Sequence, residues 1–288
     1  MRLEDHPSCR LFPEADNLTQ ITPYYEEGRK ILWMMLNAQP RPCFNMALLR
    51  DISQLKHAAQ ASGLTIDFWV TGSVVPQVFN VGGDLELFAT KIRAGERERL
   101  LSYARACIDA VYDAMTGFGT GAISIAMVEG TALGGGFEAA LAHHYLLAQR
   151  DIKMGFPEIA FNLFPGMGAY SLIARKSHMR LAETLIGTGV PHTAEWYGEK
   201  GLVDQIFEKG EAFTAVRTFV DVIRPKMNGI RAMLRARQRV LPIDRSELMD
   251  ITEDWARTAF SLEEKDLEYM ERLVMLQTRH AKQTRNGN

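Results

Sequence analysis

The sequence predicts an α/β core followed by a helical C-terminal region. Short apolar segments rich in β-branched or aromatic residues alternate with amphipathic segments through residue 207. This alternation is typical of α/β folds, in which helices connect the strands of a sheet. From about residue 210 onward the apolar spacing is helical only. We therefore expect an α/β core with an N-terminal extension over residues 1–210 and a helical region over residues 211–288.

The first predicted elements form a strand–helix–strand unit. Residues 29–36 and 65–71 are short, apolar and rich in strand-forming residues. Between them, residues 46–62 carry apolar side chains at helical spacing, and Gly63 is a suitable helix stop. The elements expected next are a helix at 97–116, a strand at 122–129, a helix that begins near Phe137 and a strand at 144–149.

Composition and charge exclude several classes of protein. The 288 residues include 33 Lys or Arg and 35 Asp or Glu, so no global attraction to nucleic acid is expected. The longest clean apolar run, Ile31 to Leu36, is far shorter than the roughly 20 residues that span a bilayer. The N-terminal residues lack the apolar core of a secretory signal. The three cysteines and seven histidines form no metal-binding pattern. We expect a reduced, soluble, cytoplasmic protein with no metal site.

Two glycine-rich stretches precede predicted helices. Residues 79–84 read Phe-Asn-Val-Gly-Gly-Asp, with Asp84 as a plausible N-cap, and residues 132–138 read Ala-Leu-Gly-Gly-Gly-Phe-Glu. Glycines at a helix start allow close backbone approach to a ligand, and free N–H groups there favour negative charge. Two converging N–H groups would form an oxyanion hole for a thioester carbonyl. Tight strand-to-helix turns explain either stretch equally well, and neither is a nucleotide-binding fingerprint.

Two glutamates are candidates for proton transfer. Glu138 lies in the first turn of its predicted helix, where a carboxylate is also a common partner of the helix dipole. Glu158 follows Phe156 and Pro157 and precedes Ile159, in a segment that we expect to be buried. Buried carboxyl groups have raised pKa values and can transfer protons near neutral pH. Two such groups facing one cavity could divide the acid and base roles.

Five short motifs follow one another along the chain. They are Val-Gly-Gly-Asp at 81–84, Gly-Thr-Ala-Leu-Gly-Gly-Gly-Phe-Glu at 130–138, Gly-Phe-Pro-Glu at 155–158, Pro-Gly-Met-Gly at 165–168 and Gly-Leu-Val-Asp at 201–204. In this order they resemble the motifs of the crotonase (enoyl-CoA hydratase) superfamily, over roughly residues 25–285. The resemblance implies a spiral core of ββα units and a homo-oligomer, a trimer or a dimer of trimers. The C-terminal helical region would then serve trimerisation or cover the active site.

The resemblance also implies roles for individual residues. It places the oxyanion hole at the backbone N–H groups of Gly83 and Gly135. It places the two hydratase glutamates at Glu138 and Glu158. Family members that only isomerise or hydrolyse often lack one glutamate of this pair, so the presence of both favours addition or removal of water.

Some positions depart from ordinary hydratases, notably Ala-His-His at 142–144 and the stretch 168–173. Four stretches look similar to the diffusible signal factor (DSF) synthases of Gram-negative bacteria that make cis-2-dodecenoic acid, namely residues 79–85, 137–141, 163–171 and 270–274. That subgroup dehydrates a 3-hydroxyacyl chain on acyl carrier protein (ACP) to the cis-2-enoyl thioester and then hydrolyses the thioester. The resemblance implies no metal or nucleotide cofactor, and a regulatory contact with a signal-sensor protein.

Two other functions fit the same motifs. One is a plain enoyl-CoA hydratase of fatty-acid degradation, with the same fold and glutamates. The other is a catalytically idle crotonase scaffold that acts by binding a protein partner, against which the intact glutamate pair argues. The sequence contains no Ser-His-Asp nucleophile elbow, so we do not expect an acyl-serine route.

Histidine, methionine and arginine residues supply further candidates. We expect His143 and His144, at the end of the Glu138 helix, to be structural. We expect the methionines, including Met167, to fill the core rather than line a substrate site. Residues 224–243 contain no acidic residue, and three arginines there recur at i, i+4 on one helix face. ACP is acidic, so this face is a docking candidate, although a solvated helix or a subunit contact explains it as well. The three arginines on this helix face are Arg231, Arg235 and Arg239.

Overall fold

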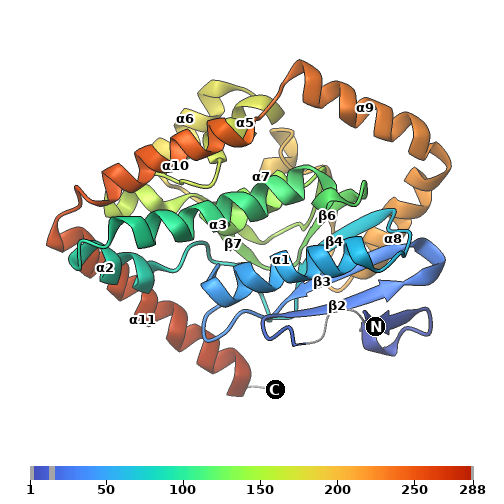
Figure 1. Cartoon of the computed structure of the whole chain (residues 1–288), viewed down its shortest axis with the longest axis horizontal. Coiled ribbons are helices and arrows are strands. Elements are labelled where there is room, and N and C mark those ends of the chain that lie inside the picture. The colour runs from blue at the N-terminus through green and yellow to red at the C-terminus, as the bar shows by residue number, and fades with distance from the viewer. Residues whose placement is uncertain (1–2, 13–16, 287–288) are drawn as a thin grey trace.

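The computed structural model describes residues 3–12 and 17–286 and is an α/β fold with two sheets (Figure 1). In these ranges the larger sheet has seven strands in the order β1-β2-β3-β4-β6-β8-β11, and the smaller has four in the order β10-β9-β7-β5. The strands are β1 (Cys9–Leu11), β2 (Ile21–Glu26), β3 (Ile31–Leu36), β4 (Phe68–Ser73), β5 (Val78–Asn80), β6 (Ile123–Val128), β7 (Thr131–Leu133), β8 (Tyr145–Gln149), β9 (Lys153–Gly155), β10 (His192–Thr193) and β11 (Gln205–Phe207).

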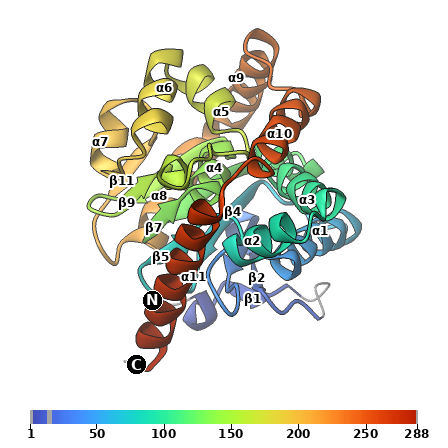
Figure 2. The same ribbon diagram turned by 90° about the vertical axis from the view of Figure 1, so that its left-hand side faces the viewer.

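Helices cover both faces of the larger sheet (Figures 1 and 2). In the part of the chain that follows β11, α10 packs on α3 and α11 packs on α2. The helices are α1 (Met46–Ala61), α2 (Leu85–Arg93), α3 (Arg97–Met115), α4 (Gly135–Ala142), α5 (Ala169–Lys176), α6 (Met179–Thr188), α7 (Ala194–Glu199), α8 (Ala212–Ile223), α9 (Met227–Val240), α10 (Arg245–Ala259) and α11 (Glu264–Asn286).

Strand β3 shows why the sheet is buried on both sides. All six of its residues are buried. Because side chains alternate along a strand, Leu32 and Met34 enter the core shared with α1 and α3, whereas Ile31 and Trp33 enter the core beneath α8. A continuous apolar run is therefore what this strand requires, and a polar residue at any of these positions would face a packed core.

The observed elements confirm the predicted fold class, with shifts at some boundaries. Strand β3 begins at Ile31 rather than residue 29, because Lys30 has a left-handed backbone with φ 53°. Helix α4 begins at Gly135, two residues before the predicted start. Strand β2 is absent from the sequence prediction and pairs antiparallel with β3 at the edge of the parallel array. In the ranges that the structure describes, no helix is both long and apolar enough to cross a membrane.

Candidate active site

The carboxyl ends of three neighbouring strands bring the predicted site residues together. Strands β5, β7 and β9 are parallel, with β7 in the middle. The chain leaves β5 toward Gly83, leaves β7 toward Gly135 and leaves β9 toward Glu158. Since parallel strands end at one edge of a sheet, segments far apart in sequence meet there. Glu138 follows on α4, one turn beyond Gly135.

The two glycine loops touch each other. Gly82 has φ +96°, and a Cβ atom there would lie 2.9 Å from the carbonyl oxygen of Leu133 and 3.1 Å from the nitrogen of Gly135. Only glycine accepts both this backbone and this contact. The hydrogen bonds of the described residues leave the N–H groups of Gly83 and Gly135 without an acceptor. Two free donors therefore lie side by side, as an oxyanion hole requires.

Glu138 is held by the loop that precedes α5. Its Oε1 atom accepts hydrogen bonds from the backbone N–H groups of Met167 at 2.7 Å and Ala169 at 2.8 Å. Gly168 between them has φ +110°, a conformation that favours glycine and directs both neighbouring N–H groups to one carboxylate. The Pro-Gly-Met-Gly motif is thus explained by the carboxylate that it positions.

Glu158 lies across the cavity on the short 3₁₀ helix Pro157–Phe161. Its Oε1 atom lies against Gly134, where a Cβ atom would collide with it. Its Oε2 atom is buried without a hydrogen-bond partner among the described residues. The expectation of a buried segment is wrong in part, because Ile159 is 43% exposed. The 3₁₀ turn directs the glutamate inward and the isoleucine outward.

Burial raises the pKa values of both carboxyl groups. The pKa of Glu138 is raised to about 7 by desolvation, which the two backbone N–H groups oppose. The pKa of Glu158 is raised to about 8 by desolvation and by the negative charge of Glu138. Backbone N–H groups of the α5 loop stabilise the charged form of Glu138, whereas the negative charge of Glu138 disfavours ionisation of Glu158. Glu138 is therefore the group that ionises more readily, and Glu158 is the group that keeps its proton to higher pH in the free protein.

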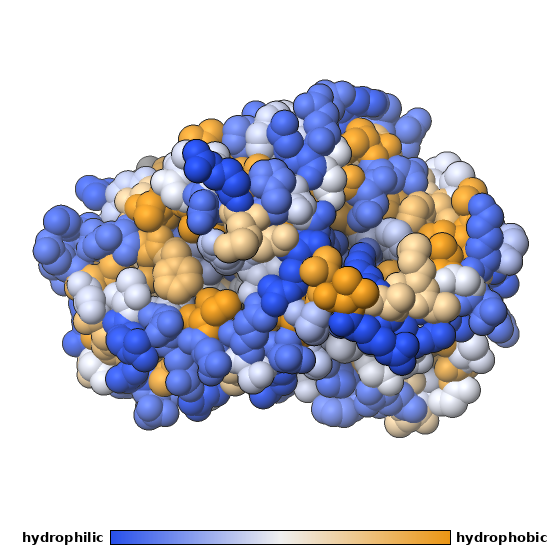
Figure 3. Space-filling view, turned by 90° about the horizontal axis from the view of Figure 1, so that it is seen from above, coloured by the Kyte–Doolittle hydropathy of each residue, from blue (hydrophilic) through white to orange (hydrophobic). Residues whose placement is uncertain are grey.

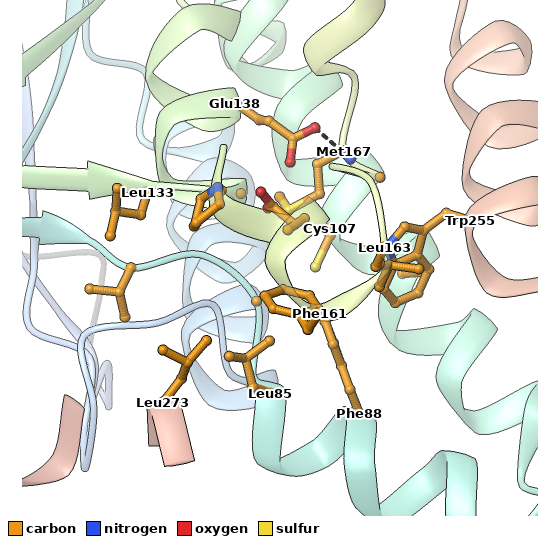
Figure 4. Close-up of a pocket in the computed structure, with 18 of the residues that line it drawn as sticks. Leu85, Phe88, Cys107, Leu133, Glu138, Phe161, Leu163, Met167, Trp255 and Leu273 are labelled. Atoms are coloured by element: carbon orange, nitrogen blue, oxygen red, sulfur yellow. Dashed lines mark hydrogen bonds between the residues drawn. The ribbon is translucent and has the colours of Figure 1, made fainter. Parts of the chain in front are cut away.

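The glutamates and glycines border one cavity of about 170 Å³. In Figure 4, Glu138 and Met167 lie at one end of the cavity, and Leu85, Phe88 and Leu273 lie at the other. Met167 belongs to the buried core, as predicted, and its side chain also lines the cavity. The sequence prediction also missed the cavity walls that distant helices supply. Helical spacing identifies which side of a helix is buried, but it does not show whether that side contacts the core or a cavity. These wall residues are Tyr103, Ala104 and Cys107 of α3, Trp255 of α10, and Tyr269, Leu273 and Gln277 of α11.

The two histidines after α4 bond to the scaffold. His143 bonds to the carbonyl oxygen of Ala139 and, through Nε2, to Oγ1 of Thr71, both at 2.8 Å. His144 accepts a hydrogen bond from the N–H of Ser124 at 2.9 Å. Burial lowers the pKa of His143 to about 4 and that of His144 to about 3. Both are neutral structural residues outside the catalytic cavity.

The three arginines proposed for docking lie on α9, which contributes no residue to the catalytic cavity. Arg235 and Arg239 are exposed. Arg231 is partly buried and donates to Oδ1 of Asp67 at 3.0 Å, so it is tied to the core. Across residues 3–12 and 17–286, no three His, Cys, Asp or Glu side chains gather in a group that could hold a metal ion.

The fold and the paired glutamates define a crotonase-type enzyme, and comparisons with known proteins agree. The chain belongs to the enoyl-CoA hydratase/isomerase family, whose model matches residues 36–244. Mitochondrial methylglutaconyl-CoA hydratase of Rattus norvegicus is 29% identical over 201 residues, 69% of this chain and 61% of the rat enzyme. The chain spans less than two thirds of the length of the first curated relatives that it matches.

Solved structures share the fold along most of the chain. Enoyl-CoA hydratase from Bacillus halodurans aligns with a TM-score of 0.73 at 17% identity, covering 88% of this chain and 98% of that one. Pseudomonas aeruginosa DspI aligns with a TM-score of 0.63 at 25% identity, covering 91% of this chain and 90% of that one. The structural similarity is thus higher to the hydratase and the sequence identity higher to DspI.

Proposed function

We propose that this protein makes a cis-2-enoic acid, a diffusible fatty-acid signal, from a 3-hydroxyacyl thioester on ACP. The enzyme would first remove water from the acyl chain and then hydrolyse the thioester in the same pocket. One observation carries the proposal: Glu138 and Glu158 both face an apolar cavity whose floor presents the free N–H groups of Gly83 and Gly135. The DSF-synthase-like motifs of the sequence and the identity to DspI support the choice of product.

Dehydration uses the two carboxyl groups as one proton-transfer pair. One carboxylate takes the Cα proton, and the thioester oxygen accumulates negative charge as the enolate forms. The N–H groups of Gly83 and Gly135 stabilise that oxygen, and loss of one such donor typically costs roughly 3 kcal/mol. The second carboxyl group gives its proton to the departing 3-hydroxyl group, which leaves as water. With pKa values raised toward neutrality, the pair can hold the single proton that this step needs.

Hydrolysis reuses the same groups. A carboxylate removes a proton from a water molecule, whose oxygen attacks the thioester carbonyl. The oxyanion hole holds the tetrahedral intermediate, and the thiol leaves with a proton from the pair. The products are the free cis-2-enoic acid and the carrier thiol, so each proton taken up is returned.

Hydration of an enoyl-CoA is the second candidate function, because the same pair catalyses the reverse of the first step. The structural similarity to the B. halodurans hydratase favours it. Incubation with matched 3-hydroxyacyl-ACP and 3-hydroxyacyl-CoA, followed by mass spectrometry, separates the two. The proposal requires free cis-2-enoic acid from the carrier-bound substrate. If enoyl thioester alone forms, the synthase proposal fails and the hydratase function stands.

Helix α9 is proposed as the docking face for ACP through its exposed Arg235 and Arg239. Replacing both with glutamate should raise KM for carrier-bound substrate, about tenfold for two lost charge contacts, and leave kcat unchanged. The matched control is Arg180→Glu on α6, another exposed arginine. A KM equally raised for a pantetheine thioester would contradict docking, since that substrate has no carrier protein.

We also propose a homo-oligomer, as in family members generally. Exposed hydrophobic side chains gather near α8 and α9, and Figure 3 shows such residues among hydrophilic ones on the right half of the upper face, where α9 lies. Sedimentation at micromolar concentration tests this proposal, and a monomer would contradict it. The exposed hydrophobic side chains near α8 and α9 are Val222, Met233, Val240 and Leu241.

A signal-sensor protein is a further proposed partner, testable by co-purification of the two proteins.

A further inference from the structure

Two hydrogen bonds fix the peptide group that carries the Gly83 N–H. The N–H of Gly82 donates to Oδ1 of Asn80 at 2.8 Å, and the N–H of Phe44 donates to the carbonyl oxygen of Gly82, also at 2.8 Å. In a trans peptide group the C=O and the following N–H lie in one plane and point in opposite directions. The bond from Phe44 therefore turns the Gly83 N–H away from the segment around Phe44.

The next peptide group is held by a buried tyrosine of α3. The N–H of Asp84 donates to the hydroxyl oxygen of Tyr103 at 3.1 Å, and this hydroxyl group donates to the carbonyl oxygen of Phe44 at 2.6 Å. An isolated parallel bridge between Phe44 and Gly83 brings the Asp84 N–H and the Phe44 carbonyl group close together. The Tyr103 hydroxyl therefore joins the loop after Gly83 to the segment that fixes Gly82.

Aromatic packing holds the Tyr103 ring in place. The residue is 3% exposed, and its ring lies edge-on to that of Phe88 with the centroids 5.5 Å apart. Phe88 contacts the same loop, because a Cβ atom on Gly83 would lie 2.5 Å from Cζ of Phe88. Burial raises the pKa of the Tyr103 phenol well above its usual value of about 10, so the hydroxyl group keeps its proton and can donate. The two rings thus contact the loop at Gly83 and at Asp84.

We propose that Tyr103 is a positioning residue for the oxyanion hole, whose hydroxyl group keeps the Gly83 N–H aimed at the thioester oxygen. This inference rests on the proposed function, because it requires a thioester bound at Gly83. A donor that is turned or displaced loses much of its effect on developing charge, whereas binding of the neutral substrate depends on it little. Loss of the hydroxyl group should therefore lower kcat more than it changes KM.

Tyr103→Phe and Tyr25→Phe form a matched pair of variants. Tyr25 is also 3% exposed, lies on β2 away from the catalytic cavity, and donates its hydroxyl to the carbonyl oxygen of Thr65 at 2.9 Å. Both variants should lower Tm, because each leaves a buried carbonyl oxygen without its hydroxyl donor. Tyr103→Phe alone should lower kcat, by about tenfold with little change in KM, which is less than the roughly 10²- to 10³-fold loss for a deleted oxyanion-hole donor.

The enolate of a bound substrate analogue reports on the oxyanion hole without turnover. The probe is an analogue of 3-oxooctanoyl pantetheine in which CH₂ replaces the thioester sulfur, so that it cannot be hydrolysed. Its enolate absorbs strongly in the near ultraviolet, unlike its neutral diketone form. Measurement at a single pH keeps the protonation of Glu138 and Glu158, which face the same cavity, equal among the proteins. The ratio of bound enolate to bound neutral form should fall about tenfold in Tyr103→Phe and stay at the wild-type value in Tyr25→Phe.

An unchanged enolate ratio in Tyr103→Phe would overturn the inference, and so would an equal decrease in Tyr25→Phe. If Tyr103→Phe does not fold, 3-fluorotyrosine at position 103 takes its place. Fluorine keeps the shape of the ring and the hydroxyl group but weakens the oxygen as an acceptor for the Asp84 N–H. The enolate ratio should then still fall, and an unchanged ratio would overturn the inference.

The same measurement separates this inference from the proposed function. If no free cis-2-enoic acid forms from carrier-bound substrate, yet the enolate ratio falls about tenfold in Tyr103→Phe, the synthase proposal fails and the positioning role stands. If the acid forms, while Tyr103→Phe keeps the wild-type kcat and enolate ratio, the positioning role fails and the synthase proposal stands.

Discussion

The backbone N–H of Met167 donates to Oε1 of Glu138 at 2.7 Å, while the side chain of the same methionine packs against Gly135. One loop residue therefore fixes a proposed catalytic carboxylate and borders the proposed oxyanion hole. This arrangement links the two halves of the chemistry, since proton transfer and enolate stabilisation must act on adjacent substrate atoms.

Removing either carboxyl group should abolish most of the dehydration activity. Glu138→Gln and Glu158→Gln keep the side-chain shape but cannot exchange a proton, so we expect kcat to fall by about 10² to 10⁴ in each. Glu129→Gln is the matched control, because Glu129 lines a groove apart from the catalytic cavity. Full activity in either cavity variant would contradict the acid–base roles.

The pH dependence of kcat/KM should be bell-shaped with its maximum between about 7 and 8, the raised pKa values of Glu138 and Glu158. The pair works with one proton. Activity therefore falls at pH values below the lower pKa, where both carboxyl groups are protonated, and at pH values above the higher pKa, where both are ionised. Initial rates from pH 5 to 10 check this expectation. A profile that is flat across the two limbs would show that neither carboxyl group titrates in the reaction.

Glu158→Gln should stabilise the protein at alkaline pH. The pKa of Glu158 is raised from 4.5 to about 8 on folding, so the folded state binds the proton more tightly. The stability of the wild type therefore decreases as the pH rises from about 4.5 through 8. The Glu158→Gln variant does not show this decrease, because an amide does not ionise. Scanning calorimetry should find the Tm of the variant higher by about 2 °C or more at pH 9, with the difference vanishing at pH 4. An equal difference at both pH values would point to packing instead of ionisation.

Gly168→Ala should lower both stability and kcat. At φ +110° an alanine is strained, and its Cβ atom would lie 2.9 Å from Leu248. The loop that donates two hydrogen bonds to Glu138 must then shift, at a cost of about 1–3 kcal/mol in unfolding free energy. Gly187→Ala in α6 is the control, because nothing lies within 4 Å of that Cβ position. Alanine there should leave kcat unchanged and slightly stabilise the helix.

Sequence reasoning predicted the α/β core, its main strands and helices, and the meeting of Gly83, Gly135, Glu138 and Glu158. Local patterns suffice for these because strand periodicity and glycine loops act over a few residues. The cavity walls could not be predicted from the sequence, because Trp255 and Leu273 reach the site only through the packing of α10 on α3 and of α11 on α2. Met167 lies in the core, as predicted, but the sequence did not show that it also lines the cavity, because an apolar side chain suits both places equally well.

The most direct test of the proposed function is the fate of water oxygen during a reaction with 3-hydroxydodecanoyl-ACP in H₂¹⁸O. The proposal predicts free cis-2-dodecenoic acid carrying one ¹⁸O atom in its carboxylate, formed by the wild type and lost in Glu138→Gln and Glu158→Gln. Enoyl thioester without free acid would contradict it, and so would labelled acid formed equally by the two variants.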